Sequence, residues 1–298
     1  MPDYVILTDS SADLSAEMVR EAGVTVLPLS FTIQGETYEN TPDNREMDPA
    51  LFYDMLRAGE LATTSAVNVA AYTDAVEPLL QAGKDVLILA FSSGLSTTCN
   101  SAEVAAEELR ERYPQRKLYV VDTLCASLGQ GLLVWLAARE QKKGRTIEEV
   151  RDWAETHKQA VCHQFTVQDL KFLKRGGRIT ATTAVLGSML QIKPLLHVDQ
   201  EGRLTAVGKA RGRHASLKTL VDRMEKTVTD EGRETVFISH GDGRGDANKV
   251  AEMVRERFGT RTSASTMWGR SSGRTPGRGR WPCSIWGRSA ERLRLTLS

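Results

Sequence analysis

The sequence predicts an α/β fold with a mainly parallel sheet, because short apolar strands alternate with helical segments along most of its 298 residues. The clearest strand, 85–91, is apolar on both faces, as expected of a strand covered by helices on each side. The composition, 41% hydrophobic and 26% charged, is typical of a globular protein and excludes collagen, coiled coil and wholesale disorder. No apolar run approaches the roughly 20 residues of a membrane-spanning helix.

Strands and helices are expected to alternate through the first half of the chain. A strand at 4–8 leads into a helix at 15–22 that ends at Gly23, and residues 24–31 form a second strand. Asp48 and Pro49 begin a helix, because Asp caps helices well and Pro fits the first turn. The elements expected next are helices at 70–80, 100–112 and 128–139, strands at 85–91 and 117–121, and a helix opened by the capping box 146–149.

A second, smaller α/β unit is expected beyond about residue 158. Residues 165–174 are expected to form a helix that ends at Gly176 and Gly177. A hairpin (195–198 with 204–206), a helix (215–227), a strand (235–239) and a helix (247–258) complete this unit. We therefore divide the chain into an N-terminal α/β domain, 1–160, a C-terminal α/β domain, 161–261, and a tail, 262–298.

The distribution of charge and the spacing of the cysteines limit which class of protein and which cellular compartment can be expected. The net charge of +1 conceals a basic end: residues 261–298 hold eight Arg and one Glu, which leaves a net charge of −6 on residues 1–260. An acidic body argues against a nucleic-acid surface. The four cysteines show no C-x-x-C spacing, and the first residues lack the basic segment of a signal peptide. We expect a cytoplasmic protein with reduced thiols and no metal or cofactor.

Small polar residues follow three of the expected strands, at 9–11, 92–94 and 122–123, and a further hydroxyl cluster lies at 63–65. Ligands of open parallel sheets collect outside the carboxyl ends of the strands. Hydroxyls and amides at helix N-termini suit an anionic group. These residues could instead cap helices, which Ser, Thr and Asp do very often. Their repetition favours an anion-binding site.

An enzyme with a nucleophilic serine is the main alternative. The segment 94–98 fails the G-x-S-x-G pattern at its last position, and none of the five histidines is marked by its spacing as a base. Phosphate-binding glycine motifs are absent as well. The residues alone therefore indicate an anion-binding α/β protein of uncertain chemistry, with a small-anion hydrolase or phosphotransferase acting through Ser93 as the alternative.

Five segments, taken together and in order, resemble the DegV family of fatty-acid-binding proteins. They are Thr8–Leu14, Thr63–Ser65, Phe91–Ala102, Val121–Thr123 and Leu173–Ile179. The resemblance covers roughly residues 3–260 and implies two α/β domains that hold a long-chain fatty acid between them. Members of the FakB type are not themselves enzymes. They present the fatty-acid carboxylate to a separate FakA-type fatty-acid kinase, and the acyl phosphate enters phospholipid synthesis.

The resemblance also implies roles for individual residues. Thr64 and Ser93 should hydrogen-bond the fatty-acid carboxylate, with Ser65, Ser92 and Gly94 shaping the loop. Arg178 and Arg211 match basic positions of the kinase-docking surface. The family's usual Gln-Pro after Thr-Ser is replaced by Ala-Val, and Thr97 stands where Gly is common. The acyl-chain wall, in a stretch that could equally be ordinary core, is expected to include Leu186, Met189, Leu190 and Ile192.

The end of the chain departs most from the family pattern. The family closes with Gly-x-His-x-Gly-Pro-Gly, whose His joins Thr and Ser at the carboxylate, whereas residues 267–287 are crowded with Gly, Arg and Trp. Back-translation from the third base of the Met267 codon can spell that closing motif, with its His across codons 274 and 275. We therefore expect a reading-frame shift between Gly259 and Met267. Residues from about 262 onward would then supply neither the last strand nor the His.

Overall fold

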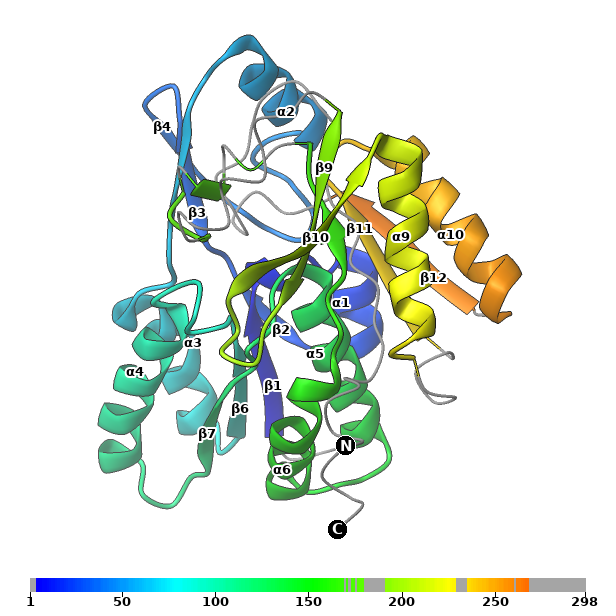
Figure 1. The fold of residues 1–298 in the computed structure, drawn as a ribbon. Coiled ribbons are helices and arrows are strands. Elements are labelled where there is room, and N and C mark those ends of the chain that lie inside the picture. Colours follow the sequence, from blue (N-terminus) through cyan, green and yellow to red (C-terminus); the bar gives the residue numbers. More distant parts are fainter. Residues whose placement is uncertain are drawn as a thin grey trace.

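A four-stranded parallel sheet forms the centre of the computed structural model, which describes residues 4–168, 170, 173–174, 176–179, 191–228, 235–259 and 261–267. Its strands, in spatial order, are β2 (Thr25–Leu27), β1 (Tyr4–Asp9), β6 (Asp85–Ala90) and β7 (Leu118–Asp122) (Figure 1). The predicted α/β class with a mainly parallel sheet is confirmed.

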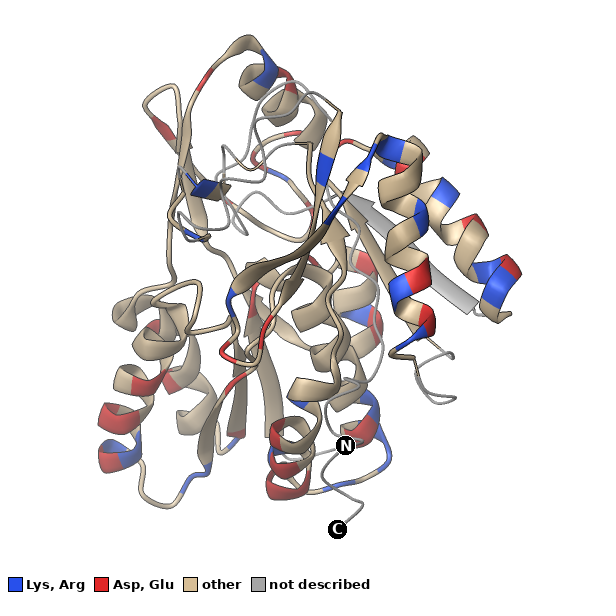
Figure 2. Cartoon of the chain, viewed as in Figure 1, with Lys and Arg blue, Asp and Glu red and all other residues tan. Residues whose placement is uncertain are grey.

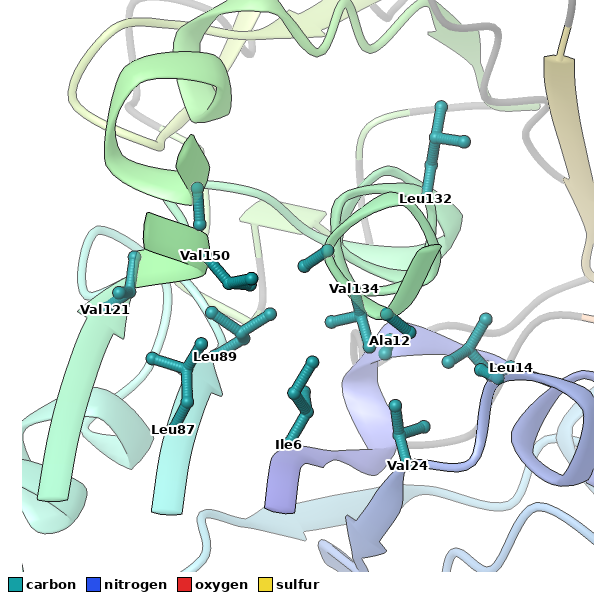
Figure 3. Close-up of a cluster of buried hydrophobic side chains, with 14 of the residues drawn as sticks. Ile6, Ala12, Leu14, Val24, Leu87, Leu89, Val121, Leu132, Val134 and Val150 are labelled. Atoms are coloured by element: carbon teal, nitrogen blue, oxygen red, sulfur yellow. The ribbon is translucent and has the colours of Figure 1, made fainter. Parts of the chain in front are cut away.

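Helices cover both faces of this sheet, as the two-sided apolar pattern of β6 predicts. Leu87 and Leu89 point into a cluster that helices on one face share, α1 (Ala16–Ala22), α5 (Ser127–Lys142) and α6 (Ile147–His157) (Figure 3). Val86, Ile88 and Ala90 point the other way, against α3 (Val69–Gln81) and α4 (Thr98–Arg112). Successive side chains of a strand alternate between faces, so both clusters come from one short apolar run.

The helix ends follow the predicted capping residues. Ser15 accepts a hydrogen bond from the Met18 amide, and Gly23 ends α1 with a φ of 75°. Asp48 caps α2 (Pro49–Ala58), with Pro49 in its first turn. Both hydrogen bonds of the expected capping box at the start of α6 are present: each of the two side chains accepts from the backbone amide of the other residue. Two 3-10 turns, η1 (Ser10–Ala12) and η2 (Lys158–Ala160), follow β1 and α6.

The prediction of one strand over residues 24–31 is wrong. β2 ends at Leu27, and the chain then forms β3 (Ser30–Ile33) in a separate antiparallel sheet, between β4 (Glu36–Glu39) and β5 (Ala62–Ser65). Pro28 separates the two strands, because it has no N–H to donate to a ladder. Helix α2 packs on this small sheet through Phe52 and Leu56, which share a hydrophobic cluster with Phe31.

The second part of the chain carries two further sheets. One is antiparallel, in the order β10 (Leu204–Arg211), β9 (Ile192–Val198), β8 (Phe165–Thr166), and contains the predicted hairpin. The other pairs β11 (Thr235–His240) with β12 (Arg261–Met267) in parallel. Helices α9 (Arg213–Glu225) and α10 (Arg244–Phe258) share a core with β9 and β11.

Two expectations for this part need correction. Phe165 and Thr166 are a strand rather than the start of a helix, because they pair with Leu196 and Leu195 of β9. The expectation that no strand forms from about residue 262 is also wrong, since 261–267 pair with β11 along its length. The second part of the chain therefore extends to Met267 as a paired strand.

The two parts of the chain meet along α5. The Trp135 ring packs edge-on against the Phe237 ring of β11, with 6.1 Å between their centroids. The Ser127 hydroxyl at the start of α5 donates to Asp13 (2.6 Å) and lies 3.3 Å from the Ser239 hydroxyl. Charged residues are frequent on helices such as α4, α6, α9 and α10 (Figure 2). Among the described helices, none combines the length and the apolar character needed to cross a bilayer.

Candidate functional site

A cavity of about 400 Å³ lies beside the carboxyl end of β6 and draws its walls from segments that are far apart in the sequence. The lining residues are Leu29, Thr64, Ser65, Ala66, Phe91, Ser93, Leu95, Ser96, Thr97 and Arg178. Hydroxyls and one guanidinium thus share a pocket with buried apolar side chains such as Leu29 and Phe91. We refer to this cavity as the hydroxyl pocket. Such a lining suits a ligand with an anionic head and an apolar body.

The structure brings four of the predicted site residues together. Thr64 and Ser65 reach the hydroxyl pocket from β5, Ser93 from the loop after β6, and Arg178 from the second part of the chain. Four other predicted residues that the structure describes lie outside the lining of the pocket: Ser92, Gly94, Ile192 and Arg211. Ile192 and Arg211 face each other across the β9–β10 ladder. Leu186, Met189 and Leu190 lie outside the described residues.

Ser96 and Thr97 also line the pocket, although neither was among the predicted site residues. They lie in the same Ser/Thr-rich loop as Ser93, between β6 and α4, so the run of hydroxyl residues was the available signal. The Ser96 hydroxyl contacts the Thr98 hydroxyl at 2.9 Å, and it accepts a hydrogen bond from the Thr98 amide. Ser96 thus also holds the first residue of α4, although the N-cap itself is Thr97.

The backbone amides of the loop after β6 are already hydrogen-bonded within the protein. The Ser93 amide donates to Asp122, and the Gly94 amide donates to the Ser92 hydroxyl, both at 3.2 Å. The amides of Leu95 and Ser96 donate to the Ser92 carbonyl. An anion in the hydroxyl pocket would therefore be bound by side-chain hydroxyls and Arg178 rather than by these amides.

Ser92 and Gly94 fix the loop against the β9–β10 hairpin instead of lining the pocket. The buried Ser92 hydroxyl donates to the Gly202 carbonyl at 2.8 Å. A Cβ added at Gly94 would lie 2.4 Å from the Glu201 carbonyl oxygen, so only glycine allows the hairpin to approach this closely. These two residues couple the loop that carries Ser93 to the second part of the chain.

We expect Gly94→Ala to destabilise the protein by about 1–3 kcal/mol, the usual cost of overpacking a close contact. The obstacle is backbone, which cannot rotate away as a side chain can. Thermal melts should show a lower midpoint for Gly94→Ala. Gly245→Ala is the matched control, because a Cβ at Gly245 meets nothing within 4 Å. An unchanged midpoint for Gly94→Ala would contradict the close contact.

The first polar cluster, at residues 9–11, is structural. The Asp9 carboxylate is fully buried and accepts hydrogen bonds from the amides of Phe91 (2.8 Å) and Ser11 (3.1 Å). Burial raises the pKa of Asp9, and its hydrogen bonds oppose that shift. The Ser10 hydroxyl accepts from the Leu29 amide at 2.9 Å. These groups hold the loops around the hydroxyl pocket but do not line it.

Arg178 enters the pocket wall because of the predicted helix end at Gly177. The Arg178 amide donates to the Leu173 carbonyl (3.1 Å), and the Gly177 amide donates to the Lys174 carbonyl (2.9 Å). Gly177 has a φ of 72°, so this pair of bonds is a Schellman end with glycine in the left-handed position. The predicted C-cap is confirmed. The guanidinium donates to the Gly176 carbonyl, which restrains it at the pocket.

The two buried histidines lie outside the lining of the hydroxyl pocket. His163 Nε2 accepts from the Ala126 amide at 3.3 Å, and burial lowers the pKa of His163 to about 4. His240 Nδ1 accepts from the Gly243 amide, and burial lowers its pKa too. Both are therefore neutral at physiological pH, and neither supplies a charge to the pocket.

The fold and the pocket define an α/β protein with a cavity lined by hydroxyls and one arginine against an apolar wall, and comparison with known proteins gives its family. The family model "Uncharacterised protein, DegV family" matches residues 3–281. A DegV domain-containing protein of Clostridium perfringens is 45% identical over 258 residues, which is 87% of this chain and 88% of the relative. The chain belongs to the DegV family.

Solved structures agree with this assignment. A DegV family protein from Thermus thermophilus, whose structure was reported for its fatty-acid binding, superposes with a TM-score of 0.80 at 28% identity. That match covers 96% of this chain and 99% of the other. The Fatty Acid Kinase (Fak) B3 protein of Streptococcus pneumoniae, loaded with linoleic acid, has a TM-score of 0.78 at 19% identity, with 96% and 99% covered. At that identity the likeness shows the shared fold.

Proposed function

We propose that this protein binds a long-chain fatty acid, with its carboxylate in the hydroxyl pocket and its acyl chain running between the two parts of the molecule. The observation that carries the proposal is the convergence of Thr64, Ser93 and Arg178 on one cavity backed by apolar side chains. Hydrogen bonds to an ionised acceptor are stronger than neutral ones, which suits hydroxyl and guanidinium donors around a carboxylate.

The kinase step is part of the same proposal. The protein would act in the cytoplasm as a carrier and not as an enzyme, presenting the carboxylate to a FakA-type fatty-acid kinase that forms the acyl phosphate. The fatty-acid binding reported for the Thermus thermophilus relative supports the choice of ligand. The kinase partner rests on the five-segment motif resemblance. Arg211, exposed at the end of β10, remains the candidate for the docking surface.

Mass spectrometry of the ligand extracted from the purified protein tests the proposal. A co-purifying long-chain fatty acid, or its uptake by the delipidated protein, is the expected result. Only a small phosphate or sugar acid in the extract, with no fatty-acid uptake, would favour the alternative of a small-anion hydrolase or phosphotransferase that uses Ser93. Adding a fatty-acid kinase and ATP to the loaded protein then tests the partner, because acyl phosphate should appear only when both proteins are present.

The position of Arg178 changes what is expected of its substitution. On a docking surface alone, Arg178→Ala would spare fatty-acid binding and impair only the kinase step. In the pocket wall, we expect it to weaken fatty-acid binding by about 1.5–3 kcal/mol, the range for a hydrogen bond to a charged group. Titration of delipidated protein measures this loss, with Arg211→Ala as the control that should bind normally. If Arg178→Ala binds fatty acid normally and only the kinase step is slowed, Arg178 acts at the docking surface and does not bind the carboxylate.

A further inference from the structure

The carboxylate of Asp122, at the end of β7, holds the loop that carries Ser93. Asp122 Oδ1 accepts hydrogen bonds from the amides of Ser93 (3.2 Å) and Leu124 (3.0 Å). The neighbouring Thr123 hydroxyl donates to the Ala90 carbonyl at 2.7 Å, just before the same loop. One side chain therefore ties together the two loops that leave the carboxyl ends of β6 and β7.

The opposite side of the loop is held in the same manner by β1. The Thr8 hydroxyl donates to the Leu89 carbonyl at 2.7 Å, and Asp9 Oδ2 accepts from the Phe91 amide at 2.8 Å. Asp9 is fully buried and belongs to the core of the first part of the chain. Asp122 is half-buried and reaches Ser93 itself, so it can be substituted with less damage to the core.

We propose that Asp122 is a positioning residue of the hydroxyl pocket: it fixes the backbone of Ser93 so that the Ser93 hydroxyl, and not its amide, is offered to the ligand. This inference rests on the proposed function, fatty-acid binding, and adds a residue that does not touch the ligand. The Ser93 amide is bonded to Asp122, which leaves the hydroxyl as the donor that Ser93 can offer to a ligand, beside the hydroxyls of Ser96 and Thr97.

The hydrogen bond to Leu124 extends the effect to the second part of the chain. Leu124 has a φ of 51°, an uncommon value for a residue other than glycine, and its Cα lies 3.1 Å from the Cβ position built on Gly202. Asp122 thus stabilises a turn against which the β9–β10 hairpin packs. Its loss would loosen both the Ser93 loop and the contact that the Ser92 hydroxyl makes with Gly202.

Three variants separate this role from a general effect on stability. Asp122→Ala removes the acceptor and should raise the Kd for a long-chain fatty acid by about tenfold, as expected for a lost hydrogen bond of roughly 1.4 kcal/mol. Asp122→Asn keeps an oxygen at Oδ1 and should bind as tightly as the unchanged protein, or more tightly, because a negative charge near the ligand is removed. Asp85→Ala is the matched control.

Asp85 makes the same kind of bond at the opposite end of the same pair of strands, where its Oδ1 accepts from the Lys117 amide at 2.9 Å. Asp85→Ala should therefore lower thermal stability while leaving the Kd unchanged. The proposal is overturned if Asp122→Ala binds fatty acid like the unchanged protein. It is also overturned if Asp122→Asn is as weak as Asp122→Ala, because the acceptor oxygen would then have no role.

Amide hydrogen exchange in the ligand-free full chain gives a readout that does not depend on the ligand. Exchange at the Ser93 and Leu124 amides should accelerate in Asp122→Ala and stay slow in Asp122→Asn and Asp85→Ala. Unchanged exchange in Asp122→Ala overturns the proposal. If the unchanged protein takes up no fatty acid, the proposed function fails, and the exchange rates alone decide whether Asp122 holds the Ser93 loop.

Discussion

Replacing Thr64 and Ser93 together by alanine is expected to abolish most fatty-acid binding. Each hydroxyl reaches the hydroxyl pocket from a different sheet, Thr64 from β5 and Ser93 from the end of β6. Each single substitution should cost about 1–3 kcal/mol, because it leaves a charged acceptor short of one hydrogen-bond donor. If the two losses add to about 2–6 kcal/mol, the double variant should bind from about 30-fold to about 10,000-fold more weakly, at 1.4 kcal/mol for each factor of ten.

Titration of delipidated protein with a long-chain fatty acid measures these losses. Thr63→Ala is the control, because Thr63 precedes Thr64 on β5 and does not line the pocket. It should bind like the unchanged protein. Full affinity in both single variants and in the double variant would refute the assignment of the carboxylate to Thr64 and Ser93.

Local sequence signals predicted the parallel sheet and its helices well, because each signal acts within one element. Asp48 and Pro49 fix the start of α2, and Gly23 fixes the end of α1, whatever the rest of the chain does. The strand break at Pro28 was missed, although the sequence carries a local signal for it, since proline cannot donate to a ladder. The partner strands of β3 were not, because β4 and β5 lie on either side of it only in the tertiary structure.

The hydroxyl residues of the site could be predicted from the sequence, but their assembly into one pocket could not. Thr64 and Ser93 were identified through family motifs, and their proximity depends on the antiparallel pairing of β5 with β3. Arg178 was placed on a docking surface, because nothing in the sequence shows that the turn at Gly177 directs it into the cavity. The function of Asp122 depends on a bond to Ser93, 29 residues away, which no local pattern reveals.

The structure also indicates how the proposed frame shift in the tail would affect the hydroxyl pocket. β12 is formed, and in a parallel pair its carboxyl end lies beside that of β11, which ends at His240. The loop after β11 contacts α2, where Asp242 pairs with Arg57. Because α2 packs on the sheet that supplies Thr64, a chain leaving β12 starts close to the layer that carries the pocket. A histidine a few residues further on, as the family motif has it, could therefore reach the carboxylate.

Restoring the reading frame after Met267 is thus expected to tighten fatty-acid binding by about 1.5–3 kcal/mol, the contribution of one hydrogen bond to a charged group. It should also raise the midpoint of thermal unfolding, because the restored frame is expected to encode an amphipathic strand after the closing motif, which can cover apolar surface. A chain that ends at Met267 is the control: if the present tail contributes nothing, this chain should melt and bind like the protein as it stands. Sequencing the gene across codons 259–267 locates the shift. If the restored and present chains have equal unfolding midpoints and equal fatty-acid affinities, the Arg- and Trp-rich tail replaces the family's closing motif in function.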